Sequence, residues 1–166
     1  MQLSKIFVYI CKMKSKEIDI DFDNSIGPWL GKTVKVMDYF LQEIINSEKL
    51  DLTKEQIIVL KKLYFKDGLN QNELAFLTLR NKSSLTRLLV KMEKKKYIIR
   101  KQSKEDKRIN HVFITPTGRE MFIKTRPVIK KVMTSMEKNI SEEEQQIMIS
   151  ILKKIQTNLG STVESI

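Results

Sequence analysis

The sequence predicts a mainly α-helical domain that carries one small β-hairpin. Apolar residues recur at spacings of three and four from residue 25 to residue 94 and from residue 117 to residue 160, as in amphipathic helices. Between these stretches, two short β-like runs flank a charged tip, which is the pattern of a hairpin. With 166 residues, the chain has the length of one domain with a sizeable core.

The first helix is expected within residues 25–50. Pro28 suits the first turn of a helix, where its missing N–H removes no hydrogen bond. The apolar stripe that follows has helical spacing and consists of Leu30, Val34, Met37, Leu41 and Ile44.

A second helix is expected to begin after Thr53. The Thr53 hydroxyl and the Gln56 amide can pair with each other's free backbone N–H groups, which is a capping box. Gly68 is expected to end this helix, because glycine readily adopts the left-handed conformation found there.

Two short helices come next. One opens at residue 70 or 71, and the other follows Asn81, a residue type that caps helix N-termini well. A turn around residues 78–80 joins them, so the pair is a helix-turn-helix. The second of them has an apolar stripe formed by Leu85, Leu88, Leu89 and Met92.

The predicted hairpin follows directly. Residues 97–101 and 109–115 are the β-like runs, and the polar residues 102–108 form its tip. A hairpin in this position is a wing beside the helix-turn-helix.

Two further helices complete the domain. One covers about residues 117–138, with Pro127 expected to kink it, and the other begins with a capping box between Ser141 and Glu144. The apolar stripe of the last helix consists of Ile147, Met148, Ile151, Leu152, Ile155 and Leu159.

The domain organisation follows from these elements. Residues 25–160 form one domain, in which residues 53–116 are the winged helix-turn-helix and residues 25–50 and 117–160 are additional helices; residues 161–166 are a tail. Residues 1–24 are an N-terminal extension with β-like alternation at 19–23. Two alternatives stay open for it: the extension is partly disordered, or translation starts at Met13 and residues 1–12 are not part of the native protein.

The positive charge of the chain is concentrated in one segment. The formal net charge is +11, and residues 80–108 hold twelve Lys and Arg against three acidic residues, a local excess of +9. Such an excess indicates a polyanionic partner, and its position over the helix-turn-helix and wing favours DNA over a membrane surface.

Several other classes of protein are disfavoured. One cysteine, Cys11, permits no internal disulfide, which fits the reducing cytoplasm where we expect the protein. One cysteine and one histidine, His111, leave no His/Cys metal site, and no cofactor motif is present. No nucleophile–base set or paired acids emerge, so no catalytic residues and no enzyme are expected. The longest apolar run near the N-terminus is too short to span a bilayer.

Two stretches of the chain resemble the MarR family of bacterial transcription regulators. One includes residues 73–75 and 81–93, with the run Leu85-Thr86-Arg87, and the other is residues 106–119, with the pattern Asp-x-Arg, an apolar strand and Thr-x-x-Gly-Arg. In motif order the resemblance covers residues 25–160. Leu79 and Lys96 depart from it, because the family often has glycine at both positions.

The resemblance implies a dimeric, sequence-specific binder of double-stranded DNA. The exposed face of the helix after Asn81 would read the major groove, where Arg87 can pair with guanine. By resemblance, Arg108 of the wing enters the minor groove and Asp106 orients its guanidinium. The predicted DNA-contacting residues are Asn81, Lys82, Ser83, Ser84, Thr86, Arg87 and Lys91 of the helix, and Lys101, Lys104, Asp106, Lys107 and Arg108 of the wing.

The first and last helices are expected to form the interface of a homodimer, because their apolar stripes are wider than a small winged domain can bury. The predicted interface residues are Leu30, Val34, Met148, Ile151, Leu152, Ile155 and Leu159. A two-fold dimer would place its reading helices one DNA turn apart, so the operator should be an inverted repeat.

Two modes of regulation remain open. In the family, a crevice beside the dimerisation helices often holds an aromatic or phenolic effector, and by resemblance the residues that would line it are Trp29, Met37, Phe40 and Tyr64. This predicts a ligand-responsive repressor. The alternative is a DNA-binding regulator without an effector, controlled by a protein partner or by its own abundance.

Overall fold

A computed structural model of the chain describes residues 21–160. The described residues fall into two compact units, which divide between Met37 and Asp38. The β-like residues 6–10, Met13 and Cys11 lie outside the described part. No helix among residues 21–160 is both long enough and apolar enough to cross a membrane.

The first unit holds a bend and the start of a helix. Residues 22–24 form the bend, in which the Asn24 backbone N–H donates to the Asp21 carboxylate at 3.0 Å. The strand-like alternation at 19–23 was therefore misleading over the described residues, because local side-chain bonds hold a turn instead. Helix α2 (Ile26–Ser47) begins here, with Pro28 in its first turn as expected.

The second unit begins with the end of α2, where Ile44 and Ile45 are buried. Helix α3 (Lys54–Phe65) follows and has the predicted capping box between Thr53 and Gln56. The helix ends earlier than expected, with Lys66 at its C-cap. Gly68 lies beyond it, at φ +72°, and a Cβ there would come within 2.9 Å of the Phe113 ring.

The helix-turn-helix consists of α4 (Gln71–Leu77) and α5 (Lys82–Lys94). Asn70 and Asn81 are their N-caps, as the sequence predicts. Leu79 in the turn adopts φ +51°, and Lys96 after α5 adopts φ +58°. Both departures from glycine therefore lie at left-handed positions, where a Cβ is unfavourable.

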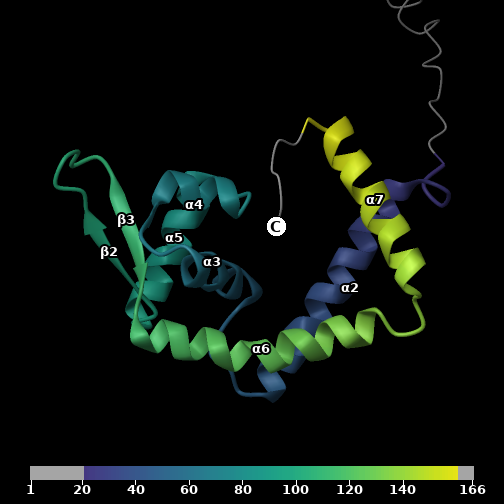
Figure 1. The fold of residues 1–166 in the computed structure, drawn as a ribbon, viewed down its shortest axis with the longest axis horizontal. Helices are drawn as coiled ribbons and strands as arrows, with labels where there is room; N and C mark the ends of the chain where they lie inside the picture. Colours follow the sequence, from purple (N-terminus) through teal and green to yellow (C-terminus); the bar gives the residue numbers. More distant parts are fainter. Residues whose placement is uncertain (1–20, 161–166) are drawn as a thin grey trace, which may run out of the picture. The chain divides into compact units, whose positions relative to one another are not determined.

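The hairpin belongs to a three-stranded antiparallel sheet in the order β1-β3-β2. Strands β2 (Ile98–Gln102) and β3 (Asn110–Ile114) form the predicted wing, which projects beyond α3, α4 and α5 in Figure 1. Strand β1 (Leu69–Asn70) pairs with the other edge of β3. The sequence did not predict β1, because two residues are too short to display a periodicity.

Helix α6 (Pro116–Met136) starts immediately after the wing. Thr115 caps it by accepting the Gly118 N–H at 3.0 Å, and Pro127 lies inside it. Gly118 is buried against the wing, and a Cβ there would lie 2.1 Å from the carbonyl oxygen of Tyr97. This close approach explains why the run Thr-x-x-Gly requires glycine: any side chain would push α6 off the base of the wing.

Helix α7 (Glu142–Asn158) begins with the predicted capping box at Ser141 and Glu144. None of its residues is buried, although Ile147, Met148 and Ile151 lie along it with exposed fractions of 60, 57 and 40%. The core of the second unit lies elsewhere, among α3, α4, α5, the sheet and α6.

We expect Lys96→Gly to stabilise the protein. Glycine relieves a left-handed strain of about 1–2 kcal/mol but costs roughly 0.5–1 kcal/mol of chain entropy, so the net gain should be about 0.5–1 kcal/mol. Urea unfolding at a fixed chain concentration measures it. The control is Lys91→Gly, five residues away and inside α5, which should destabilise by about 1 kcal/mol. Destabilisation by both changes would contradict the strain at Lys96.

Candidate nucleic-acid interface

Burial of one face fixes the orientation of α5. Leu85, Leu89 and Met92 have exposed fractions of 1, 0 and 0%, so this stripe locks the helix against the core. The opposite face is open to solvent. Most of the predicted DNA-contacting residues of the helix lie there, namely Asn81, Lys82, Ser83, Thr86, Arg87 and Lys91; Ser84 is half-buried.

Side-chain bonds within α5 order its first turn. The Asn81 side-chain oxygen accepts the Ser84 backbone N–H at 2.8 Å and the Ser83 hydroxyl at 2.9 Å. The Thr86 hydroxyl donates to the Lys82 carbonyl at 2.8 Å. These bonds present the N-terminal end of the helix in one conformation, with Lys82 and Arg87 extending from it.

A contact that the sequence did not reveal ties this turn to α3. Arg80 donates from Nη1 to the Ser84 hydroxyl at 3.1 Å and pairs through Nη2 with Glu55 at 3.7 Å. Burial raises the pKa of Glu55, but hydrogen bonds from the Thr53 hydroxyl and from its own N–H, together with Arg80, lower it overall. The Ser84 hydroxyl is thus engaged within the protein.

Three of the twelve basic residues in the segment 80–108 form ion pairs. Arg80 pairs with Glu55, Lys95 with Asp51 at 2.6 Å, and Arg100 with Glu93 at 2.6 Å. The sequence alone did not separate them from the others. The remaining nine, none of which forms an ion pair among residues 21–160, are Lys82, Arg87, Lys91, Lys94, Lys96, Lys101, Lys104, Lys107 and Arg108.

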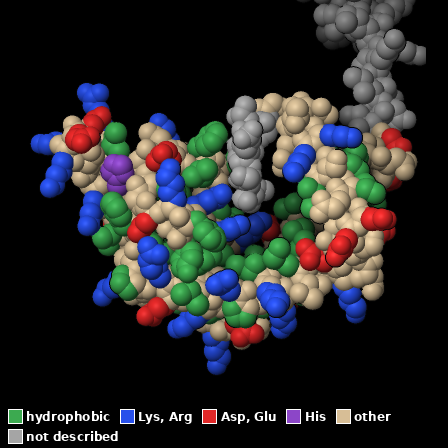
Figure 2. Space-filling model, viewed as in Figure 1, with side chains coloured by type: hydrophobic (Ala, Val, Ile, Leu, Met, Phe, Trp, Pro, Cys, Tyr) green, Lys and Arg blue, Asp and Glu red, His purple; other side chains and the backbone are tan. Residues whose placement is uncertain are grey.

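The tip of the wing carries several of these charges, and Figure 2 shows Lys and Arg side chains gathered at the projecting end of the hairpin. Two hydrogen bonds from backbone N–H groups hold its loop: Ser103 N–H donates to the Ile109 carbonyl at 2.8 Å, and Asp106 N–H donates to the Ser103 hydroxyl at 3.3 Å. Lys104, Asp106, Lys107 and Arg108 are exposed, and Lys101 Nζ lies 5.4 Å from the Phe113 ring centre.

Asp106 contacts the backbone of Arg108 in this structure. Its carboxylate accepts the backbone N–H of Arg108 at 2.8 Å, and none of the ion pairs among residues 21–160 joins it to the Arg108 guanidinium. A two-residue reach favours the adjacent amide over the end of a long side chain. Asp106 therefore shapes the loop, and the guanidinium of Arg108 is left to solvent.

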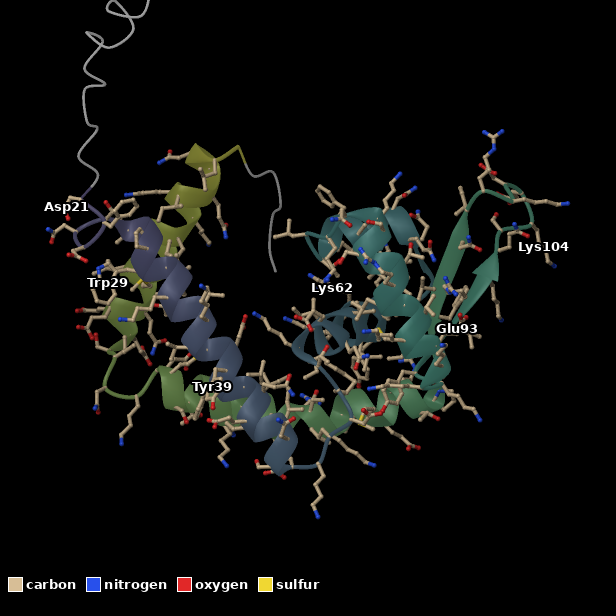
Figure 3. All side chains as sticks on the ribbon, turned by 180° about the vertical axis from the view of Figure 1, so that it is seen from behind. Asp21, Trp29, Tyr39, Lys62, Glu93 and Lys104 are labelled. Atoms are coloured by element: carbon tan, nitrogen blue, oxygen red, sulfur yellow. The ribbon has the colours of Figure 1, made fainter. Side chains whose placement is uncertain are left out.

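A second acid links α5 to the wing. Glu93 accepts three hydrogen bonds from Arg100: from the backbone N–H at 3.1 Å, from Nε at 3.1 Å and from Nη2 at 2.6 Å. The Arg100 side-chain bonds are the main cause of the lowered pKa of Glu93, which burial only partly opposes. Figure 3 shows Glu93 where α5 meets the hairpin, with Lys104 at the far end of the wing.

Asp67 also links separate elements through its carboxylate, at the base of β3. One carboxylate oxygen accepts the backbone N–H groups of Gly68 and Ile114 at 3.0 and 2.8 Å, and the other accepts Arg119 Nη2 at 3.2 Å. Arg119 also lies over the Tyr64 ring at 5.8 Å. Nothing in the run Lys-Asp-Gly predicted this role, since its partners are about fifty residues away.

The four predicted effector residues belong to different units. Trp29 and Met37 lie in the first, where Trp29 is 57% exposed and donates Nε1–H to the Asp23 carbonyl at 2.7 Å. Phe40 and Tyr64 lie in the second, where the Tyr64 ring packs 4.9 Å from that of Phe122. Hollows of about 410 and 390 Å³ occur along α7 and beside α6, and neither is lined by any of these four residues.

The predicted interface residues are largely accessible. On α7, Met148 and Ile151 are exposed and Leu152 and Ile155 are half-buried, and Leu159 at its C-cap is exposed. On α2, Val34 is exposed and Leu30 is half-buried. Among residues 21–160, no group of three His, Cys, Asp or Glu side chains could hold a metal ion. The ring Nδ1 of His111 lies 2.9 Å from the Gly68 carbonyl, between β3 and the turn before β1.

Known proteins are similar to this chain in sequence and in architecture. The model of the MarR family matches residues 52–109. The HTH-type transcriptional regulator SarZ of Staphylococcus epidermidis is 32% identical over 145 residues, covering 82% of this chain and 95% of the relative. The MepR–DNA complex of S. aureus superimposes with a TM-score of 0.75 at 25% identity, covering 81% of this chain and 98% of MepR. Bordetella bronchiseptica BpsR has a TM-score of 0.76 at 18% identity, covering 82% and 96%.

Proposed function

This chain belongs to the MarR family of DNA-binding transcriptional regulators, and from that premise we propose that it is a homodimeric repressor that binds an inverted-repeat operator and releases it when a small ligand binds. It is a regulator and not an enzyme. The observation that carries the proposal is that the nine basic residues of the segment 80–108 that form no ion pair among residues 21–160 lie on α5, just after it, and in the wing.

The exposed face of α5 supports reading of the major groove. Ser83 and Arg87 are one helical turn apart on that face, and neither is covered by the protein. Arg87 can donate two hydrogen bonds to the O6 and N7 atoms of a guanine, while Lys82 and Lys91 are placed for phosphates. In this proposal Asn81 and Ser84 act mainly by ordering the first turn, because their side chains are already hydrogen-bonded.

The wing supports a minor-groove contact. Its loop is fixed by the backbone, whereas the Arg108 side chain extends into solvent. A guanidinium is favoured in a narrow minor groove because the negative potential is enhanced there. Lys101, Lys104 and Lys107 would pair with the flanking phosphates.

Homodimerisation is supported by α7, which buries no residue within the chain. An exposed apolar stripe on a terminal helix is typical of a surface that a partner covers. A second copy is the partner we propose, because two-fold dimers are the commonest assemblies of soluble proteins and would match an inverted repeat.

The proposed ligand control draws on a structural relative. DNA binding by BpsR of Bordetella bronchiseptica is regulated by 6-hydroxynicotinic acid, and we extend the idea of a small aromatic effector to this chain. A second candidate is a regulator without an effector, controlled by a protein partner or by abundance.

Substitutions should separate the basic residues that contact DNA from those that serve the fold. On an operator selected from random duplexes, Arg87→Ala should cost about 1–3 kcal/mol and relax the base preference at one position. Lys104→Ala should reduce the slope of log affinity against log salt by about 1. Lys95→Ala is the control and should leave the slope unchanged, because its charge is paired with Asp51. Equal slopes for all variants would contradict this partition.

The dimer interface can be tested with two matched isoleucines. Ile151 on α7 and Ile99 on β2 are 40 and 41% exposed. Ile151→Glu should dissociate the dimer into monomers in sedimentation velocity, because it buries charge in an apolar contact. Ile99→Glu should leave the dimer intact. A dimer that survives Ile151→Glu argues against α7 as the interface.

An effector can be sought with the single tryptophan as reporter. Among aromatic carboxylates and phenols, a compound that releases the operator should also change the fluorescence of Trp29, which is half-exposed in the free protein. Phe40→Ala should weaken both effects. If no compound of these classes releases the operator, the second candidate replaces the first.

A further inference from the structure

The contact between Glu93 and Arg100 joins the two parts of the proposed DNA-reading surface. Glu93 is in the last turn of α5 and Arg100 is in the middle of β2, opposite Val112 of β3. The Glu93 carboxylate accepts one hydrogen bond from the Arg100 backbone N–H and two from the Arg100 guanidinium. These three bonds set both the position of Arg100 beside α5 and the direction of its side chain. Figure 3 shows the two elements meeting at Glu93.

This contact lies on the unpaired edge of the wing. In the order β1-β3-β2, β3 is held on both sides, while β2 pairs only with β3. The Arg100 N–H points to the open side, where a neighbouring strand would otherwise accept it. The Glu93 carboxylate takes that place, so the outer strand of the wing is fastened to α5 by a side chain instead of a strand.

The geometry makes the wing sensitive to this attachment. The paired part of the hairpin ends at Gln102 and Asn110, and the loop with Arg108 projects beyond it. At about 3.3 Å per residue, Gln102 lies roughly 7 Å from Arg100, and the tip lies farther still. A small rotation of β2 about its base therefore becomes a larger displacement of Arg108.

We propose that Glu93 and Arg100 are positioning residues, which hold the wing at a fixed angle to α5 so that Arg108 enters the minor groove while Arg87 reads the adjacent major groove. The inference rests on the proposed DNA-reading function. It gives Arg100 a role distinct from that of the other wing cations, because its guanidinium faces Glu93 and contributes no phosphate contact.

A second ion pair provides the control for stability alone. Lys95 and Asp51 are also 2.6 Å apart, and they join the C-cap of α5 to the loop before α3. Among residues 21–160, neither side chain forms a hydrogen bond or ion pair with β2 or β3. Asp51→Ala removes an ion pair with the same N–O distance from the same unit of the chain. It should affect folding as Glu93→Ala does while leaving the wing attached.

The test is a double-mutant cycle on duplex binding. Arg108→Ala is compared in three backgrounds: the unaltered chain, Glu93→Ala and Asp51→Ala. We expect a loss of affinity of about 10-fold in the first and third, and of less than about 3-fold in Glu93→Ala, because a detached wing no longer delivers Arg108. Hydroxyl-radical protection of the minor groove should weaken in Glu93→Ala, while protection of guanine N7 persists.

Amide hydrogen exchange in the free protein gives a readout that needs no DNA. The Arg100 N–H should exchange faster in Glu93→Ala than in the unaltered chain or in Asp51→Ala. Glu93→Gln keeps an acceptor for this N–H but loses the charge, so it should give intermediate exchange and an intermediate coupling to Arg108. If Glu93→Ala does not fold, Glu93→Gln serves in the same cycle.

The outcomes separate this inference from the function on which it rests. An equal cost of Arg108→Ala in all three backgrounds, with unchanged minor-groove protection, overturns the positioning role and leaves DNA reading intact. Unaltered exchange of the Arg100 N–H in Glu93→Ala overturns it as well. Failure of the unaltered chain to bind any duplex overturns the proposed function instead. In that case, exchange of the Arg100 N–H alone shows whether Glu93 attaches the wing to α5.

Discussion

The burial of a single apolar stripe on α5 determines what the protein can present to DNA. Leu85, Leu89 and Met92 are almost fully excluded from solvent, so rotation of the helix about its axis would expose apolar area at about 25 cal/mol per Å². In the orientation that this burial fixes, Ser83 and Arg87 face outward. The N-cap at Asn81 and the bridge from Arg80 to Glu55 then fix where the helix begins and how it lies against α3.

Around this helix, basic residues have two different tasks. Arg80 pairs with Glu55 of α3, Lys95 with Asp51 of the loop before α3, and Arg100 with Glu93 of α5. These pairs connect the region of α5 to α3, to the loop before α3 and to the wing. The other cations of the segment have no such partner among the described residues. The electrostatic surface offered to DNA is therefore smaller and more localised than the excess of +9 suggested.

Local patterns predicted the elements well where their determinants are close in sequence. The capping boxes at Thr53 and Ser141, the N-cap at Asn81 and the two wing strands all depend on residues within a few positions of one another. Prediction failed where the partner is remote or the pattern too short. Strand β1 has two residues, and Asp67 gains its role from Ile114 and Arg119. The orientation of the Arg108 guanidinium by Asp106 stays a prediction, and in this structure the same carboxylate accepts the Arg108 backbone N–H.

The sequence by itself determined the helix-turn-helix, the wing and the concentration of positive charge over both, because periodicity, caps and charge are local properties. Only the tertiary structure decided which cations are neutralised, that Gly118 must touch the Tyr97 carbonyl, and that Glu93 reaches across to Arg100. These facts depend on the distance between side chains of different elements, and that distance follows from how the apolar faces pack together.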